Sequence, residues 1–327
     1  MSDAMDRRTF LGALAGLAAG AAGAARADAA GPADPVRPPR LREGIPTRRL
    51  GRTELEIPII GPGGFHVGSA GSESAARRLL DTALAEGMRF IDTAESYQRG
   101  TSEEWIGAAL RGGRDQVVLM TKTFDLDTRS AASAERHLEG SLARLKTDYL
   151  DVWQLHSVRT VEDVDRAFRP GGAMEFILEA KQRGVVRFVG VTGHARPEAN
   201  RRALDYWDRG FEFDVMQMPL NPLDHHERSF ERGVLPGLVE RDIGVIAMKT
   251  SAQGALPAGD VCSVAECLRY VWSLPVSVAV VGMEREELVR GNARMAREFE
   301  PMTEPELAAF RARIATRAGN GLERYKA

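Results

Sequence analysis

Short apolar runs alternate with longer segments of helical periodicity along most of this chain. Each run is rich in β-branched residues and is followed by roughly 10–15 residues with an apolar face, an alternation typical of βα repeats. The pattern predicts eight strands, at residues 57–65, 88–94, 117–122, 149–156, 187–193, 213–218, 244–250 and 276–282. It predicts helices at residues 72–86, 102–110, 130–145, 172–183, 197–209, 229–241, 264–274, 284–296 and 304–316.

Eight βα repeats over about 240 residues predict an α/β fold of the (β/α)8 TIM barrel type. A doubly wound sheet would show a G-x-G-x-x-G turn that opens a helix after its first strand. The Gly61-Pro62-Gly63-Gly64 segment is glycine-rich, but we do not expect it to open a helix with that spacing. Residues 48–57 alternate polar and apolar positions and predict an N-terminal β-hairpin that covers the bottom of the barrel.

The first 46 residues have a different composition. Arg7, Arg8 and Phe10-Leu11 precede a short Ala/Gly/Leu run that ends in Ala25-Arg26-Ala27, a pattern similar to a twin-arginine export signal. We therefore expect residues 1–27 to be an export signal peptide, residues 28–46 a flexible linker, and residues 47–327 the barrel domain. The precursor would engage the twin-arginine machinery, and the mature protein would be periplasmic or secreted.

Net charge, apolar runs and cysteine spacing exclude several classes of partner and site. The formal net charge is −2 and basic residues are dispersed, so we expect no nucleic-acid partner. The N-terminal apolar run is too short to cross a bilayer comfortably, so we expect no membrane span in the mature chain. The two cysteines, Cys262 and Cys267, are five positions apart, and we expect reduced thiols that face different sides of a helix.

Four polar residues stand at or just after the ends of predicted strands: Asp92, Tyr97, Lys122 and His156. In a parallel barrel the C-terminal ends of the strands meet at one mouth, which is where the active sites of such barrels lie. A free tyrosine titrates near ~10, and a nearby cation such as Lys122 would lower that value. Asp92 would hold the ammonium charged, and His156 could donate a hydrogen bond to a substrate oxygen. Tyr97 could then protonate a carbonyl oxygen.

Several separated motifs resemble the aldo/keto reductase family, in the correct order between about residues 47 and 292. They are RRLGRTELEIPIIGPGG, FIDTAESYQRGTSEEWIG, Thr121-Lys122 and DYLDVWQLH. The resemblance implies an oxidoreductase that reduces an aldehyde or ketone with NADP as cofactor, or NAD. It implies that Asp92, Tyr97, Lys122 and His156 form the active site, with Tyr97 as general acid.

The resemblance also implies the residues that bind the cofactor. Thr192 and Gln217 match contacts to the nicotinamide carboxamide, with His194 where the family usually has asparagine, and Met248 stands where many members place an aromatic residue. Lys249 and Ser251 follow for the pyrophosphate. The full implied set is Gly64, Thr192, His194, Gln217, Met248, Lys249, Ser251, Gly282, Arg285 and Asn292.

The last two residues of this set bear on whether the cofactor is NADP or NAD. Arg285 is the candidate for a 2′-phosphate, although Glu284 beside it would repel one, and Asn292 matches a residue that approaches the adenine. NADP is therefore the expected cofactor, with NAD as an alternative.

Two other functions are compatible with the pattern. One is a nucleotide-binding subunit for redox sensing or regulation that has little turnover. The other is a barrel hydrolase with a metal at His194, His225 and His226, although adjacent histidines point apart, and we expect no metal. The loops at the barrel mouth determine the substrate, and their sequence does not predict their shape.

Overall fold

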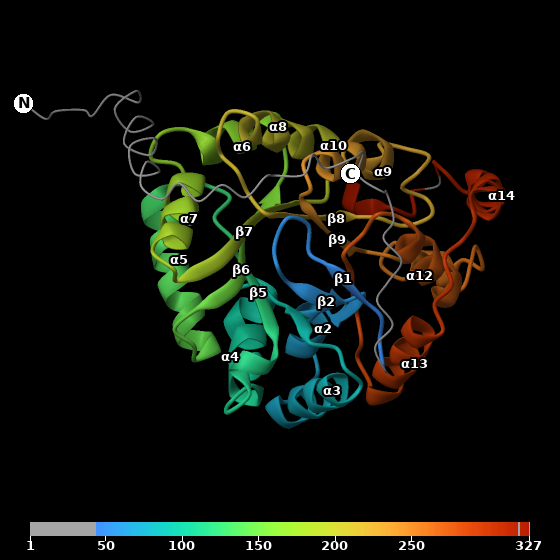
Figure 1. Cartoon of the computed structure of the whole chain (residues 1–327), viewed down its shortest axis with the longest axis horizontal. Coiled ribbons are helices and arrows are strands. Elements are labelled where there is room, and N and C mark those ends of the chain that lie inside the picture. Colours follow the sequence, from blue (N-terminus) through green and yellow to red (C-terminus); the bar gives the residue numbers. More distant parts are fainter. Residues whose placement is uncertain (1–43, 320, 327) are drawn as a thin grey trace, which may run out of the picture. The chain divides into compact units, whose positions relative to one another are not determined.

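The computed structural model describes residues 44–319 and 321–326. The predicted export signal, and residues 28–43 of the predicted linker, lie outside this range. Within it, eight parallel strands form the predicted barrel (Figure 1). These strands are β3 (Ile60–Pro62), β4 (Phe90–Asp92), β5 (Val118–Thr123), β6 (Leu150–Val158), β7 (Val186–Gly193), β8 (Val215–Pro219), β9 (Gly244–Met248) and β10 (Val278–Val281).

The strands follow the order β3-β10-β9-β8-β7-β6-β5-β4, and a parallel bridge between Gly63 and Asp92 joins the two ends of the sheet. Neighbouring parallel strands require crossover connections, and these run through the helices around the barrel. The helices are α2 (Gly64–Gly68), α3 (Glu73–Ala85), α4 (Thr101–Ala109), α5 (Ala131–Leu145), α6 (Val161–Phe168), α7 (Ala173–Gln182), α8 (Pro197–Trp207), α9 (Phe230–Gly233), α10 (Leu235–Glu240), α11 (Ala255–Ala258), α12 (Val264–Ser273), α13 (Glu286–Arg297) and α14 (Glu304–Ala315). Three 3-10 turns complete the set: η1 (Tyr97–Gly100), η2 (Arg114–Gln116) and η3 (Arg324–Lys326).

Local sequence accounts for the starts of several helices. Ser72 and Ser130 accept backbone hydrogen bonds at the starts of α3 and α5, as N-cap residues do. The single helix predicted at residues 229–241 is wrong, because the chain breaks at Val234 into α9 and α10. Pro236 stands in the first turn of α10, where its missing N–H group is tolerated.

The first predicted strand, residues 57–65, is also wrong in its boundaries. Ile57 and Pro58 belong to the hairpin of β1 (Thr47–Arg49) and β2 (Glu56–Pro58), and Gly64 opens the short helix α2. Leu50 and Ile57 of the hairpin pack inside the barrel against strand residues such as Phe90 and Ile246. The backbone N–H of Arg52 donates to the Asp242 carbonyl, just before β9, at 2.6 Å. The hairpin therefore covers the N-terminal end of the barrel, as predicted.

The expectation that the two cysteines face different sides is wrong. Their sulfur atoms lie 3.3 Å apart at the start of α12. Side chains at the residue before an N-cap and at the fourth helical position meet across the first turn, whatever the helical angle between them.

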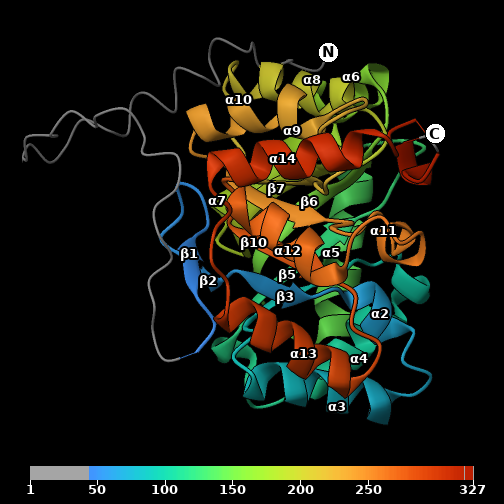
Figure 2. The same cartoon turned by 90° about the vertical axis from the view of Figure 1, so that its right-hand side faces the viewer.

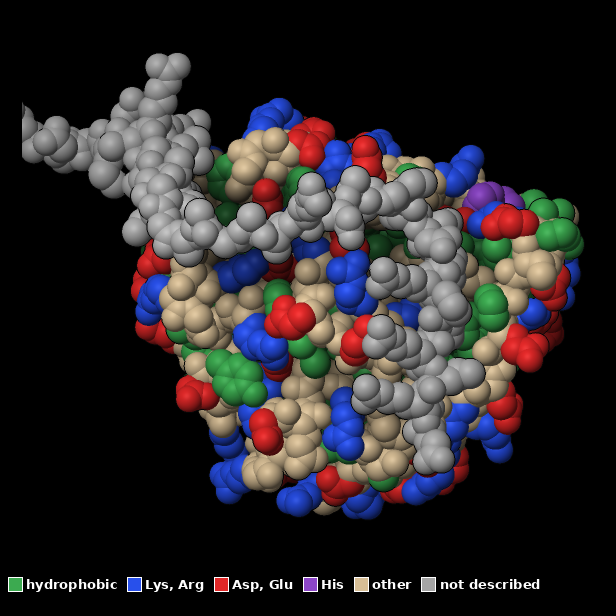
Figure 3. Space-filling model, viewed as in Figure 1, with side chains coloured by type: hydrophobic (Ala, Val, Ile, Leu, Met, Phe, Trp, Pro, Cys, Tyr) green, Lys and Arg blue, Asp and Glu red, His purple; other side chains and the backbone are tan. Residues whose placement is uncertain are grey.

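The molecular surface mixes charges of both signs. On the face shown in Figure 3, which carries the hairpin, basic and acidic side chains lie interspersed. A helix with the length and apolarity that a bilayer crossing demands is not found among residues 44–319 and 321–326.

Candidate active site

Three neighbouring strands bring the predicted catalytic residues together at the C-terminal end of the barrel. Asp92 ends β4, Lys122 lies in β5 and His156 in β6, while Tyr97 begins η1 just after β4. The Lys122 ammonium contacts the Asp92 carboxylate and donates to the Thr93 carbonyl at 2.7 Å. It also lies 3.3 Å from the Tyr97 hydroxyl and 4.9 Å from the centre of its ring. A phenol is thus held against a buried cation.

The pKa of Tyr97 differs from our expectation. Burial raises the pKa of the phenol above its ordinary value of 10.0, and the attraction of Lys122 lowers it by less than that. The nearby Asp92 charge adds to the increase. The expected lowering by Lys122 is therefore present but outweighed, and Tyr97 stays protonated at neutral pH, as a proton donor must.

Lys122 stays charged despite its burial. Burial alone would lower the pKa of its ammonium, but the attraction of Asp92 and Tyr97 reverses that shift and raises the pKa above 10.5. A charged ammonium beside the phenol stabilises the phenolate that remains when the proton leaves.

His156 presents a neutral imidazole to the same space. Its ring centre lies 6.0 Å from that of Tyr97 and 5.2 Å from that of Phe124, both edge to face. Burial, with repulsion from Lys122 and His194, lowers the pKa of His156 well below 6.5. The Nδ1 atom is buried and has no hydrogen-bond partner. A neutral imidazole keeps one N–H group to donate to a ligand oxygen.

The next two strands place two more unpaired polar atoms in the barrel. Thr192 in β7 pairs in register with Gln217 in β8. The Thr192 hydroxyl and the Gln217 side-chain oxygen are both buried without a hydrogen-bond partner. Buried polar atoms in native proteins are rarely left unpaired. A bound carboxamide, which has both donors and an acceptor, could satisfy both atoms.

His194 follows β7 and lies beside these residues. Its Nε2 is 3.2 Å from the Ser157 hydroxyl, and its Nδ1 is buried and unpaired. Burial and the nearby charge of Lys249 lower the pKa of His194 to about 3, so the ring is neutral.

Lys249 lies where β9 turns into the next connection. Its backbone φ is positive, at 54°, which turns the chain out of the strand direction. Ser251 lies two residues further on. Burial and repulsion by Lys122 lower the pKa of Lys249 to about 8. The neighbouring Met248 is partly buried at the end of the strand. Lys249 is partly buried, and among residues 44–319 and 321–326 it forms no ion pair with an acidic side chain. Such a cation suits a bound phosphate.

The remaining predicted cofactor residues have diverse surroundings. A Cβ on Gly64 would lie 2.3 Å from the Asp92 carbonyl, so close packing of α2 accounts for this glycine. A Cβ on Gly282 would meet the His66 ring at 2.3 Å. Arg285 is the exposed N-cap residue of α13, and Asn292 is buried further along that helix. Arg285 is therefore open to solvent shortly after β10, whereas Asn292 is covered by its neighbours.

Arg129 is a buried residue that our reading of the sequence missed. Its guanidinium donates to the carbonyls of His156 at 2.8 Å and Ser157 at 2.9 Å. It also forms two hydrogen bonds with the Asp163 carboxylate, at 2.9 and 2.8 Å. Thr160 followed by Asp163 three positions later is a sequence signal for the start of a helix, and the Thr160 hydroxyl does accept from the Asp163 backbone N–H. No local pattern indicates that the distant Arg129 pairs with Asp163. Arg129 therefore fixes the backbone that carries His156.

The C-terminal turn η3 also reaches the barrel mouth. The Tyr325 ring lies 5.4 Å from the Lys249 ammonium, and its hydroxyl accepts a hydrogen bond from Asn221 at 2.7 Å. Lys326 forms a buried ion pair with Asp224 at 2.7 Å. The end of the chain is thereby anchored beside the cation that suits a phosphate.

The histidines of the metal-hydrolase alternative do not converge. His225 pairs with Glu231 at 2.8 Å, whereas His194 contacts Ser157. Across the described ranges, no three histidine, cysteine or acidic side chains are grouped as metal ligands. This alternative gains no support.

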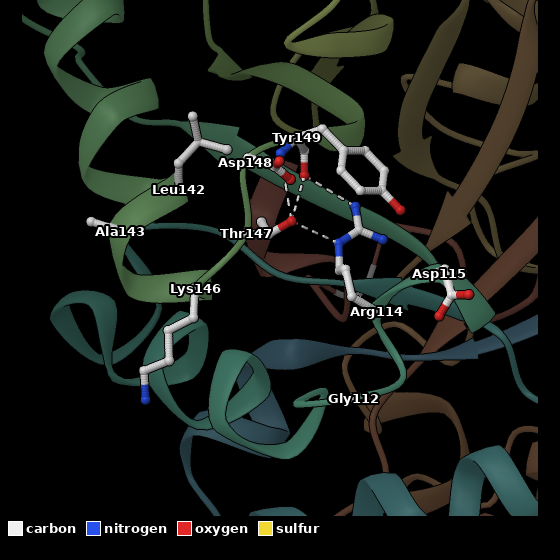
Figure 4. A pocket seen from close by; sticks show the side chains of 9 residues that line it. All are labelled: Gly112, Arg114, Asp115, Leu142, Ala143, Lys146, Thr147, Asp148 and Tyr149. Carbon is white, nitrogen blue, oxygen red and sulfur yellow. Dashed lines mark hydrogen bonds between the residues drawn. The ribbon is translucent and has the colours of Figure 1, made fainter.

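A surface cavity lies at the opposite end of the barrel (Figure 4). Arg114 crosses it, with its guanidinium 4.1 Å from the centre of the Tyr149 ring and 3.1 Å from the Tyr149 carbonyl. The residues that line it precede strands β5 and β6: Gly112, Arg114, Asp115, Leu142, Ala143, Lys146, Thr147, Asp148 and Tyr149. Residues at the N-terminal ends of barrel strands serve stability, so we do not assign this cavity a catalytic role.

Comparison with known proteins gives a consistent result. The sequence model described as "Aldo/keto reductase family" matches residues 59–263. The chain is 30% identical over 260 residues to the uncharacterized oxidoreductase YqkF of Bacillus subtilis, covering 77% of this chain and 76% of that protein. It is 29% identical over 212 residues to the methylglyoxal reductase YeaE of Escherichia coli, covering 61% and 66% of the two chains.

Solved structures resemble the fold as well. An aldo/keto reductase from Klebsiella pneumoniae, in complex with NADP and acetate, has a TM-score of 0.68 and 26% identity, covering 82% of this chain and 95% of that one. The holo form of the aldo-keto reductase AKR11C1 from Bacillus halodurans has a TM-score of 0.69 and 25% identity, covering 86% and 100%.

Proposed function

Because this chain belongs to the aldo/keto reductase family of NAD(P)-dependent oxidoreductases, we propose that it reduces an aldehyde or ketone to an alcohol with NADPH. The observation that carries the proposal is the contact of the Tyr97 hydroxyl with the Lys122 ammonium, which Asp92 holds in place. A protonated phenol beside a buried cation is suited to protonate a carbonyl oxygen.

In this mechanism each residue has one task. When bound, NADPH supplies the hydride that reaches the carbonyl carbon. Tyr97 gives its proton to the carbonyl oxygen, and Lys122 stabilises the phenolate that is left. Neutral His156 donates its ring N–H to the same oxygen and orients it. Asp92 keeps Lys122 charged and directed at the phenol.

The nucleotide would lie across the C-terminal ends of β7 to β10. Thr192 and Gln217 would bind the nicotinamide carboxamide, which pairs their buried oxygen atoms. His194 would border that group and Met248 would pack on the ring. Lys249 and Ser251 would bind the pyrophosphate, and the backbone at Gly64 and Gly282 would border the same mouth.

The adenosine end would lie against α13. Its residue Asn292 would approach the adenine. Arg285, at the start of the helix, would bind the 2′-phosphate of NADP. A helix N-terminus also favours an anion through its free backbone N–H groups.

A carbonyl screen tests the proposed function. Purified protein is mixed with a panel of aldehydes and ketones and with NADPH or NADH, and loss of reduced-cofactor absorbance is followed. We expect turnover of at least one carbonyl, with a lower KM for NADPH. Tight nucleotide binding without turnover of any carbonyl would instead favour the regulatory subunit.

Arg285 is expected to set the cofactor preference. Replacing Arg285 with alanine removes the candidate partner of the 2′-phosphate and should raise the KM for NADPH about tenfold, the value of one charged hydrogen bond. The KM for NADH should not change. Arg290→Ala is the matched control, because Arg290 is exposed on the same helix and pairs with Glu286. Equal KM values for both cofactors in the wild type would contradict the preference.

Nucleotide affinity should decrease as the pH rises past the pKa of Lys249. This pKa is lowered to about 8, so the Lys249 side chain is positively charged at pH 7. It loses its proton, and with it the positive charge, as the pH rises above about 8. The Kd for NADPH should rise by up to about tenfold per pH unit above that value. Fluorescence titrations between about pH 7.5 and 9.5 measure the change. Lys249→Met should bind weakly and lose this dependence; a variant that keeps it would assign the titration to another group.

We also propose that the precursor is exported through the twin-arginine route. The support is the Arg7-Arg8 pair before the short apolar run and the Ala25-Arg26-Ala27 end. Replacing Arg7 and Arg8 with lysine should leave the full-length precursor inside the cell, as measured by fractionation and immunoblot. Arg26→Lys, outside the arginine pair, serves as control. Unchanged export of the Arg7→Lys/Arg8→Lys variant would contradict the route.

A further inference from the structure

The two cysteines of the chain meet at the start of α12. Cys262 immediately precedes the N-cap residue Ser263, and Cys267 is the fourth residue of the helix. Their Sγ atoms are 3.3 Å apart. These two positions normally carry apolar residues that pack together across the first turn. In this chain, the only two cysteines occupy both of them.

The backbone that holds the pair is fixed by a capping box. The Ser263 hydroxyl accepts from the Glu266 backbone N–H at 3.2 Å, and the Glu266 carboxylate accepts from the Ser263 backbone N–H at 2.8 Å. Glu266 is held in turn by an ion pair with Arg313 of α14. The sulfur atoms must approach from 3.3 Å to about 2.05 Å to bond, a small movement of two side chains.

The two thiols differ in reactivity. The hydrogen bond between the two sulfur atoms lowers the pKa of Cys262 below its ordinary value of 9.0. Cys267 is fully buried, and the same interaction, together with burial, raises its pKa. Cys262 retains 6% exposure. A disulfide oxidant would therefore react first with Cys262, the thiol that more readily forms a thiolate.

From this arrangement we propose that Cys262 and Cys267 form an intrachain disulfide by exchange with a low-molecular-weight disulfide such as oxidised glutathione. The Cys262 thiolate attacks one sulfur of the oxidant and releases one thiolate, leaving a mixed disulfide. The Cys267 thiolate then attacks the Cys262 sulfur and releases the second thiolate. The protein loses two electrons and two protons, and the oxidant becomes two thiols.

The bond would fix a segment that borders the candidate site. Residues 249–261 connect the end of β9 to Cys262. They include Lys249, Ser251 and helix α11, and Figure 2 shows α11 and α12 on the face of the barrel that is turned toward the viewer. One end of this segment is held by the barrel sheet. The disulfide would tie its other end covalently to α12. The inference depends on the cysteine pair alone and not on the proposed reductase function.

Fragment mapping of the full-length chain tests the proposal. The native protein is incubated with oxidised glutathione, remaining thiols are alkylated, and the chain is cut after Glu266, which lies between the cysteines. We expect the fragments that contain Cys262 and Cys267 to remain joined until a reductant is added. A stable single glutathione adduct, a disulfide-linked dimer or two alkylated thiols would overturn the proposal.

Thermal unfolding provides an independent measurement. Oxidation of the wild type should raise the midpoint by about 2–6 °C, because the bond restricts the unfolded chain. Cys262→Val is the matched control, since valine keeps the apolar contact with Cys267 but forms no bond. Its midpoint should be the same with and without oxidant. An equal shift in wild type and variant would show that the cysteine pair is not responsible.

Discussion

Replacing Tyr97 with phenylalanine should lower kcat for carbonyl reduction by about 10²–10⁴-fold, the usual contribution of a positioned general acid. The substitution removes one oxygen atom and leaves the ring, which packs edge to face against Phe65 and His156 at 5.6 and 6.0 Å. Lys122 keeps its contacts with Asp92 and Thr93. The Kd for NADPH and the unfolding midpoint should therefore remain close to the wild-type values.

Steady-state kinetics and fluorescence titration together check this result. Tyr149→Phe is the control, because Tyr149 lines the cavity at the other end of the barrel, where its ring faces the Arg114 guanidinium (Figure 4). It should leave kcat unchanged. Wild-type reduction rates in Tyr97→Phe, with the nucleotide still bound, would exclude Tyr97 as the proton donor.

The largest effect on stability is expected from Arg129→Met. The substitution removes the guanidinium that the carbonyls of His156 and Ser157 now accept from. It also removes the buried partner of the Asp163 carboxylate, which keeps only the Arg159 backbone N–H and the more exposed Arg166. Removing one partner of a buried ion pair costs about 3–5 kcal/mol in unfolding free energy. That cost should lower the unfolding midpoint by about 10 °C in a domain of this size. Chemical denaturation measures it directly.

Two further variants separate the ion pair from nonspecific damage. Arg166→Met removes a more exposed arginine that also contacts Asp163, at 3.2 Å, and should cost less than about 1 kcal/mol. Replacing Asp163 with leucine in the Arg129→Met background removes the carboxylate that has lost its buried partner, and should recover part of the loss. Equal losses in Arg129→Met and Arg166→Met would show that the buried guanidinium has no special role.

The pH dependence of stability should reflect the same pair. Burial alone would raise the pKa of Asp163, but the hydrogen bonds and charge of Arg129 outweigh burial and lower it. A carboxyl group with a lowered folded-state pKa contributes stability above its unfolded pKa, near ~3.9, and loses it as the pH falls further. Arg129→Met should lose this acid-side contribution.

The sequence by itself determined the barrel and the positions of its four central polar residues. Strand and helix periodicities are local properties, and parallel strands necessarily bring their C-terminal ends together. The strand ends alone therefore place Asp92, Lys122 and His156 at one mouth. The boundary near Ile57 was less predictable, because Ile57 pairs within the hairpin and packs inside the barrel, which local preference does not reveal.

Only the tertiary structure decided which side chains hold those residues in place and how the pKa values of the site are shifted. Arg129 is 27 residues from His156 in sequence, and Tyr325 is far from Lys249, so no periodicity relates them. The pKa of Tyr97 depends on whether burial or the Lys122 charge dominates, and burial dominates. The contact between Cys262 and Cys267 depends on where α12 begins. Local patterns specify elements, whereas burial and electrostatic fields are sums over all the elements packed around a group.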